Sequence, residues 1–148
     1  MLARRAQAAT VEAKELEREI AEHVCILAPG LLAEPGVGVI VAAQLLVAWS
    51  HHGRVHSEAA FARLAGVAPL PASSGQTVRH RLSRGGDRQL NRALHTIILH
   101  RRTHDPATKD YIERRVAEGK SRREATRPLK RYVARHLYRL LEQQPAMT

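Results

Sequence analysis

The segment between residues 66 and 87 carries side chains of the types that can act on a phosphodiester. Arginine suits bidentate contact with phosphate oxygens, and a serine hydroxyl held beside a bound phosphate can be turned into a nucleophile. Ser73 and Ser74 precede Gly75, although a serine beside a glycine is also common in turns. The basic side chains that can converge on one phosphate are Arg79, His80, Arg81, Arg84 and Arg88. This segment is therefore a candidate phosphate-binding site with a candidate nucleophile.

The same segment shows no helical periodicity and contains two prolines and four glycines. Residues 77–82 alternate enough in polarity to allow one short strand. We therefore expect a long basic loop with at most a short strand. A loop of this length inside a compact domain usually has a function, unless the secondary structure around it is wrongly assigned.

A second candidate phosphate site is the turn at residues 35–38, Pro-Gly-Val-Gly. It lies between a short expected helix and the apolar run at residues 39–49, which is the pattern of a helix-hairpin-helix. Glycines can adopt backbone angles closed to other residues and leave N–H groups unobstructed at a helix N-terminus, where an anion is favoured. The predicted phosphate contacts are Gly36, Val37 and Gly38. The alternative is a plain turn between two core helices.

The charge of the chain is unevenly distributed. The 148 residues carry a net charge of +10, yet residues 1–34 hold four Lys or Arg against six Glu, a net −2, so the rest carries +12. A folded domain tolerates such self-repulsion most readily when a polyanion neutralises it. Nucleic acid is therefore the first partner to consider, and a basic surface kept for solubility is the alternative.

The fold class is predicted to be mainly all-α, with an amphipathic, coiled-coil-like helix over residues 1–28 and a helical domain over residues 29–148. In the first helix, Leu16, Ile20, Val24 and Leu27 share one face, between glutamates on the others. This helix can pack on its own domain or pair with a copy of itself.

Helix starts in the second part are indicated by capping residues. Ser57 is expected to cap a helix over residues 58–65, Asp87 one over residues 87–104, and Pro106 to begin the next. Ser121 and Glu124 form a capping box for the last helix, which Pro128 should bend. Its expected core face is Leu129, Tyr132, Val133, His136, Leu137, Leu140 and Leu141. The opposite, basic faces are expected to be solvated or to follow a duplex: Arg101, Arg102, Arg114, Arg115, Lys120, Arg122, Arg123, Arg127, Lys130, Arg131 and Arg135.

Metal and membrane chemistry find little support in the sequence. Cys25 is the one cysteine, and although His100 and His104 are four apart on an expected helix, nothing nearby completes a tetrahedral ligand set. We therefore expect no metal site in this chain. The longest apolar stretch, residues 37–49, is too short to cross a bilayer, so we expect a cytoplasmic protein without membrane contact.

Several ordered blocks of the chain resemble one family. The blocks EPGVGVIVAAQLL (34–46), SEAAFARLAGVAP (57–69), ASSGQTVRHRLSRGGDRQLN (72–91), KSRRE (120–124) and LKRYVAR (129–135) are similar to the C-terminal domain of the IS-one-ten insertion-sequence transposases. The resemblance covers nearly the whole chain.

This resemblance implies a DNA recombinase that moves insertion sequences and is guided, in studied members, by a structured (bridge) RNA. The family's serine lies directly before Gly in the segment after Gly-x-Ala-Pro, which corresponds to Ser74, with the adjacent Ser73 as the less favoured alternative. Its hydroxyl would attack a DNA phosphodiester and form a phosphoserine link. Arg79, Arg81 and Arg84 are our choices for stabilising the pentacoordinate phosphate.

The family also has an N-terminal RuvC-like domain with four acidic ligands for a divalent metal, expected to be Mg²⁺, and is expected to act as a homo-oligomer. Because Met1 opens just ahead of the first helix, we expect this chain to be a fragment without that domain, to hold no cofactor and to be inactive alone. Two hypotheses follow: a DNA-binding, serine-bearing transposase module, or a non-catalytic nucleic-acid-binding or dimerisation remnant.

Overall fold

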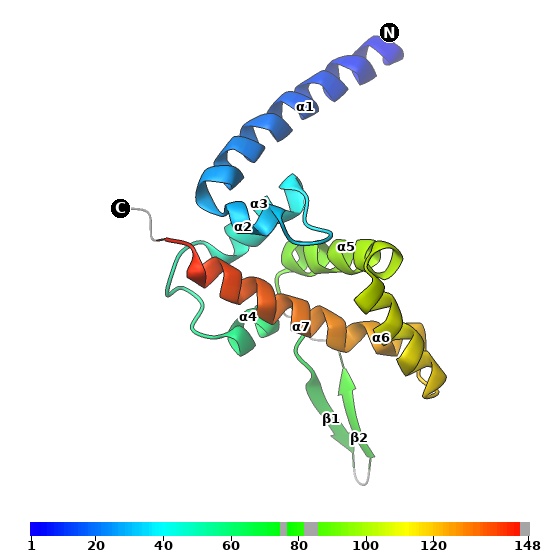
Figure 1. The fold of residues 1–148 in the computed structure, drawn as a ribbon. Coiled ribbons are helices and arrows are strands. Elements are labelled where there is room, and N and C mark those ends of the chain that lie inside the picture. The colour runs from blue at the N-terminus through cyan, green and yellow to red at the C-terminus, as the bar shows by residue number, and fades with distance from the viewer. Residues whose placement is uncertain (75–76, 82–85, 146–148) are drawn as a thin grey trace.

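The computed structural model describes residues 1–74, 77–81 and 86–145 and is mainly helical, as predicted (Figure 1). In chain order its elements are α1 (Leu2–Leu27), α2 (Pro29–Leu32), α3 (Val39–Trp49), α4 (Glu58–Leu64), β1 (Leu70–Ser74), β2 (Thr77–Arg81), α5 (Arg88–His104), α6 (Pro106–Ala117) and α7 (Arg122–Gln143). The helix α7 packs against α4, α5 and α6, and the two strands form a hairpin that projects from this body (Figure 1).

One hydrophobic core joins α3, α4, α5 and α7 with the end of α1. Phe61 on α4 is fully buried, and its ring lies 5.7 Å from that of Tyr138 on α7. The Tyr138 hydroxyl donates a hydrogen bond to the Val55 carbonyl at 2.8 Å, which satisfies the one polar atom that this ring buries. Leu94 and Ile97 of α5 complete this centre at 0% exposure.

The predicted helix starts are confirmed. The side chains of Ser57 and Asp87 accept hydrogen bonds from the backbone N–H groups of the third residues after them, Ala60 and Leu90. The helix α6 begins at Pro106, with Asp105 as its N-cap. The capping box of α7 is complete, since Ser121 Oγ accepts from Glu124 N at 3.1 Å and Glu124 Oε2 accepts from Ser121 N at 3.2 Å.

The expected core face of α7 is right except at Tyr132 and at His136, whose side chain is 42% exposed and pairs with Glu34. Leu137 and Leu141 are fully buried, whereas Tyr132 is 52% exposed and lies under the Arg131 guanidinium, 5.5 Å from its ring centroid. At 100° per residue, Tyr132 lies on the opposite side of the helix from Leu141. Ala134 and Tyr138 fill the core there instead.

The helix α1 matches its predicted bounds, but only its last two turns reach the core. Val24 is buried and Ile20 packs against the core, while Leu16 is 52% exposed and Leu27 is also exposed. The N-terminal part of α1 extends away from the other elements (Figure 1). The predicted apolar face is therefore covered by this chain at its C-terminal end alone.

The expectation of at most one short strand between residues 66 and 87 is wrong. The predicted strand is present as β2, but it pairs antiparallel with a second strand, β1. Proline usually argues against a strand, and Pro69 and Pro71 obscure the alternation of β1 in the sequence. A proline is tolerated here because a two-stranded sheet has only edge strands.

Glu58 joins α4 to α7 through two ion pairs. Its Oε2 accepts a hydrogen bond from Arg135 Nε at 3.1 Å, and its Oε1 accepts one from Arg139 Nη1 at 3.0 Å. Desolvation raises the pKa of Glu58, but hydrogen bonds from Arg139 and Arg135 outweigh it, so the pKa lies below its ordinary value. The pairs stabilise the fold only while this carboxylate is ionised.

Replacing Glu58 with glutamine is expected to lower the urea midpoint at neutral pH and to flatten the fall of that midpoint in acid. A carboxylate whose pKa is lowered in the folded state contributes stability above its unfolded pKa, and this contribution is lost as the pH falls through the folded value. Urea unfolding between about pH 7 and pH 3 measures both effects. Glu118→Gln is the matched control, because among the described residues Glu118 pairs with Arg115 alone, three residues before it on the same helix end. Equal pH slopes for wild type and Glu58→Gln would contradict this assignment.

Candidate nucleic-acid interface

The pairing register of the hairpin groups the predicted site residues by face. Ser74 pairs with Thr77, Ala72 with Arg79 and Leu70 with Arg81, whereas Ser73 pairs with Val78 and Pro71 with His80. Residues directly opposite one another share a face of the sheet, and alternate residues of a strand share a face. The positions of Ser74, Arg79 and Arg81 therefore belong to one face, and those of Ser73 and His80 to the other.

The base of the hairpin is fixed to the helical body at the junction of α4 and α5. Asp87 N donates to Leu64 O at 2.6 Å, and Asn91 Nδ2 donates to Ala65 O at 2.8 Å. A Cβ at Gly86 would lie 2.6 Å from Leu64 O and 2.8 Å from Gly66 N, so the two ends of the segment cross with no room for a side chain. Both strands thus leave the body from an anchored point.

The remaining predicted residues of this segment lie beyond the hairpin. Arg88 is exposed and is the first residue of α5. Arg84, like Gly75, lies outside the described residues. The structure therefore relates Arg79 and Arg81 to Ser74 through strand pairing, and Arg88 only through the anchored base.

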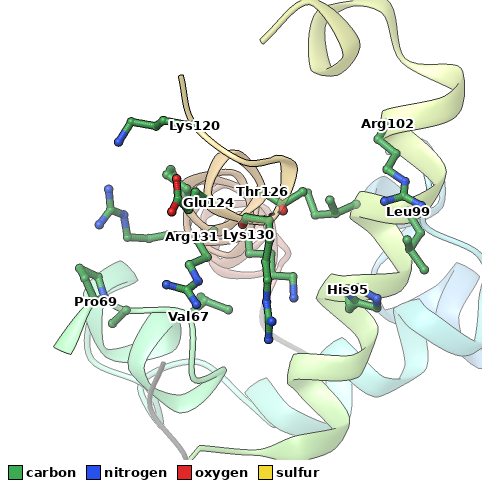
Figure 2. A pocket seen from close by; sticks show the side chains of 15 residues that line it. Val67, Pro69, His95, Leu99, Arg102, Lys120, Glu124, Thr126, Lys130 and Arg131 are labelled. Carbon is green, nitrogen blue, oxygen red and sulfur yellow. Dashed lines mark hydrogen bonds between the residues drawn. The ribbon is translucent and has the colours of Figure 1, made fainter. Parts of the chain in front are cut away.

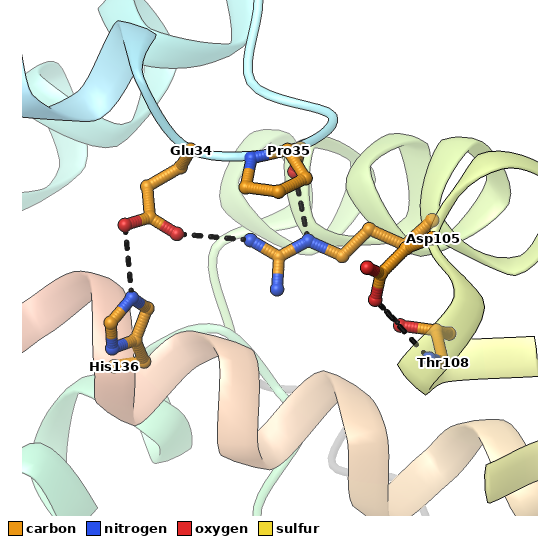
Figure 3. Close-up of polar contacts among 6 residues, drawn as sticks. Glu34, Pro35, Asp105, Thr108 and His136 are labelled. Carbon is orange, nitrogen blue, oxygen red and sulfur yellow. Dashed lines mark hydrogen bonds and ion pairs between the residues drawn. The ribbon is translucent and has the colours of Figure 1, made fainter. Parts of the chain in front are cut away.

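The turn predicted to bind phosphate is clamped to two helices. Glu34, just before it, accepts from Arg101 Nη2 of α5 at 3.3 Å and pairs with His136 Nε2 of α7 at 3.1 Å (Figure 3). Arg101 Nε donates to the Pro35 carbonyl at 2.8 Å. These contacts join residues far apart in the sequence and hold the turn against α5.

Within the turn, the three predicted contact residues have different surroundings. Gly36 has φ +81°, and a Cβ there would lie 2.9 Å from Ile97 O. Val37 is buried, and its N–H donates to Glu34 O at 3.2 Å. Gly38 is the N-cap of α3, and a Cβ there would meet nothing within 4 Å. An anion can therefore approach through Gly38 and the first turn of α3, where amide groups lack intrahelical acceptors.

Among the basic side chains, the structure distinguishes two groups that the sequence does not separate. Arg101, Arg115 and Arg135 pair with Glu34, Glu118 and Glu58, so they are neutralised within the chain. A second group surrounds a pocket beside α7: Arg102, Lys120, Arg123, Arg127, Lys130 and Arg131. The one signal in the sequence is that Glu34 and Glu58 each lie more than ten residues from any other acidic residue.

The histidines contact backbone groups, carboxylates and aromatic rings of the fold. His52 Nε2 lies 3.2 Å from Glu142 O, and its ring meets the Trp49 ring edge-on at 4.8 Å. The His100 and His104 rings lie 4.6 Å apart on α5. Within the part of the chain that the structure describes, no three His, Cys, Asp or Glu side chains gather at metal-binding distance. None of the helices formed by these described residues has the length and apolar character that a membrane crossing requires.

The sequence that forms this helical body and its hairpin matches a known class, the insertion-sequence transposases. Residues 29–113 match the model of the Transposase IS116/IS110/IS902 family. The match covers the turn, the hairpin and α5 in one stretch. This chain belongs to that family.

Two curated relatives support this assignment. The 43.6 kDa protein of insertion element IS110 from Streptomyces coelicolor is 37% identical over 116 residues, which are 78% of this chain and 29% of that protein. The 42 kDa protein of insertion element IS900 from Mycobacterium paratuberculosis is 35% identical over 115 residues, which are 75% of this chain and 28% of that protein. The chain spans less than a third of the length of these relatives.

Proposed function

We propose that this chain is the DNA-binding, serine-bearing module of an IS110-family transposase, and that Ser74 forms a phosphoserine link with DNA. The observation that carries the proposal is the hairpin register, which assigns Ser74, Arg79 and Arg81 to the same face. A nucleophile and two cations on one face meet the needs of phosphoryl transfer, since the attacking oxygen and the developing negative charge lie a few ångströms apart. Ser73, on the opposite face, lacks this alignment with the arginines.

The chemical step is a transesterification. Ser74 Oγ attacks the phosphorus, a phosphoserine ester forms, and the bond from phosphorus to the 3′ oxygen of the neighbouring nucleotide breaks. The proton leaves the serine hydroxyl and the departing 3′ oxygen gains one, so no water is consumed. The ester preserves the energy of the bond for rejoining, which is the advantage of a covalent intermediate in strand exchange.

The chain's own residues would position the DNA and stabilise the negative charge that develops on the phosphate. Arg79, two residues along the sheet from the Ser74 position, would offer guanidinium donors to the equatorial phosphate oxygens as charge develops, and Arg81, four residues along, would bind the strand beside that phosphate. The anchored base at Gly86 and Asp87 would limit movement of the hairpin relative to α5. A Mg²⁺ ion bound by a RuvC-like domain, a guide RNA and a homo-oligomeric enzyme belong to the same proposal, as implications of the family resemblance.

DNA binding by this chain tests the proposal directly. A fluorescein-labelled duplex is titrated with the wild type and with Arg79→Gln/Arg81→Gln at several salt concentrations, and anisotropy gives the affinity. Wild-type affinity is expected to fall steeply with salt, because bound cations release counterions from the phosphates. The double variant is expected to bind at least about tenfold more weakly, with a salt slope smaller by about 2.

The matched control is Arg4→Gln/Arg5→Gln, which removes the same charge from an exposed part of α1. This control is expected to change affinity by less than about threefold, as a long-range effect screened by salt. Equal losses in the two double variants would mean that only net charge matters, and would reject the hairpin as the phosphate site. DNA binding without any covalent protein–DNA adduct would favour the alternative, a non-catalytic nucleic-acid-binding remnant.

A further inference from the structure

A pocket of about 610 Å³ lies between α5, α7 and the segment that enters the hairpin (Figure 2). One side is formed by α5 with His95 and Arg102, another by Val67 and Pro69, and Lys130 and Arg131 of α7 lie between them. This volume far exceeds the space that one water molecule occupies in the liquid, about 30 Å³. The pocket can therefore hold a group of nucleotide size. No sequence pattern points to this pocket, because its walls come from three separate segments.

The cations that line this pocket are not paired with carboxylates in the described part of the chain. Among the described residues, the six Lys and Arg side chains that line it form no ion pair, whereas Arg135 and Arg139 farther along α7 share Glu58. The one carboxylate in the lining, Glu124, is hydrogen-bonded in the capping box of α7. The Arg131 Nε atom is buried and has no hydrogen-bond partner among the described residues. The pocket therefore offers a ligand positive charge that the described residues leave uncompensated.

Two titratable groups in the pocket record this positive potential. Desolvation lowers the pKa of Lys130, and the charges of Arg123 and Arg127 lower it further. Desolvation also lowers the pKa of His95, as do the charges of Lys130 and Arg102. Cations that repel one another in this way are stabilised when an anion binds between them.

The position of the pocket relates it to the hairpin. Pro69 lines it, and β1 begins at the next residue and ends at Ser74. Five residues of extended chain span at most about 17 Å, which is roughly five nucleotide steps along one strand of a duplex. A DNA strand held at the hairpin can thus extend into the pocket, where Val67 and Ile98 add apolar surface for a sugar.

We propose that this pocket binds the phosphodiester backbone of DNA a few nucleotides from the phosphate held at the hairpin. This inference rests on the proposed function, since it takes DNA as the ligand. The pocket acts as a second anchor that fixes the path of the strand. It contacts backbone rather than bases, so it contributes affinity without sequence preference.

The test compares Arg123→Gln/Arg127→Gln with wild type and with the Arg4→Gln/Arg5→Gln control in the anisotropy titration. Both pocket arginines are exposed on α7, so their replacement does not open the core. The pocket variant is expected to bind the duplex at least about tenfold more weakly, with a salt slope smaller by about 2. Affinity and slope equal to those of the control, with wild-type binding intact, would overturn the pocket and leave the proposed function standing. Absence of wild-type binding would overturn both.

A second measurement tests the pocket in the wild-type chain, with all of its basic side chains in place. The His95 imidazole is titrated by NMR in the wild type with and without the duplex, and His95→Asn identifies its resonance. Bound phosphates are expected to raise the pKa of His95 by offsetting Lys130 and Arg102. An unchanged titration of His95 while the duplex is bound would overturn the pocket as a DNA site.

Discussion

Replacing Ser74 with alanine is expected to remove the covalent protein–DNA adduct and to slow strand transfer more than about a thousandfold. Alanine lacks the oxygen that forms the ester, so the variant cannot make the phosphoserine link. DNA affinity should stay within about twofold of wild type, because the positive charge is unchanged. The assay incubates the chain with labelled donor and target duplexes, Mg²⁺ and an added RuvC-like half, and resolves adducts by denaturing electrophoresis.

Ser73→Ala is the matched comparison, since it removes the same atom one residue earlier and on the opposite face of the hairpin. It is expected to retain the adduct. If Ser73→Ala loses the adduct and Ser74→Ala keeps it, the nucleophile is Ser73 and the alignment of Ser74 with Arg79 and Arg81 has no catalytic role. If neither substitution changes a detectable adduct, the phosphoserine mechanism is wrong for this chain.

The parts of the fold set by local interactions could be predicted from the sequence. Ser57, Asp87 and Ser121 cap helices because their oxygens satisfy nearby backbone N–H groups, so neighbouring residues alone determine these starts. The apolar repeat of α5 likewise matches its buried face, with Leu90 and Leu94 at 0% exposure. Such signals depend on residues only three or four apart.

The parts that depend on distant contacts could not be predicted. The sequence groups Arg101 with the exposed cations, but this side chain contacts Glu34, 67 residues before it in the chain. The pocket has no sequence signal, because Val67, Arg102 and Arg127 come together only through packing. Strand β1 escapes prediction since its pairing partner, rather than its own proline-containing sequence, determines it. In the candidate site, residue types indicate phosphate chemistry, while pairing supplies the alignment of Ser74 with the arginines.

The turn at Gly36 shows how one residue can serve packing where the sequence indicates ligand binding. The sequence pattern predicts that this glycine keeps N–H groups open to a phosphate. In the structure, its positive φ lets the chain turn while it lies against α5, close to the backbone of Ile97. Its primary physical role is therefore close approach between the turn and α5, and phosphate access falls to Gly38 and the start of α3.

Gly36→Ala is accordingly expected to lower the free energy of unfolding by about 2–5 kcal/mol. A residue with a Cβ costs about 1–2 kcal/mol at positive φ, and forcing the turn away from Ile97 O costs about 1–3 kcal/mol more. Gly53→Ala isolates the first contribution, because Gly53 has φ +85° and an added methyl group there would meet nothing within 4 Å, so about 1–2 kcal/mol is expected. Urea unfolding of both variants measures the difference. Equal losses would show that α5 yields to the methyl group, whereas a Gly36→Ala variant of wild-type stability that binds DNA more weakly would restore the phosphate role of this glycine.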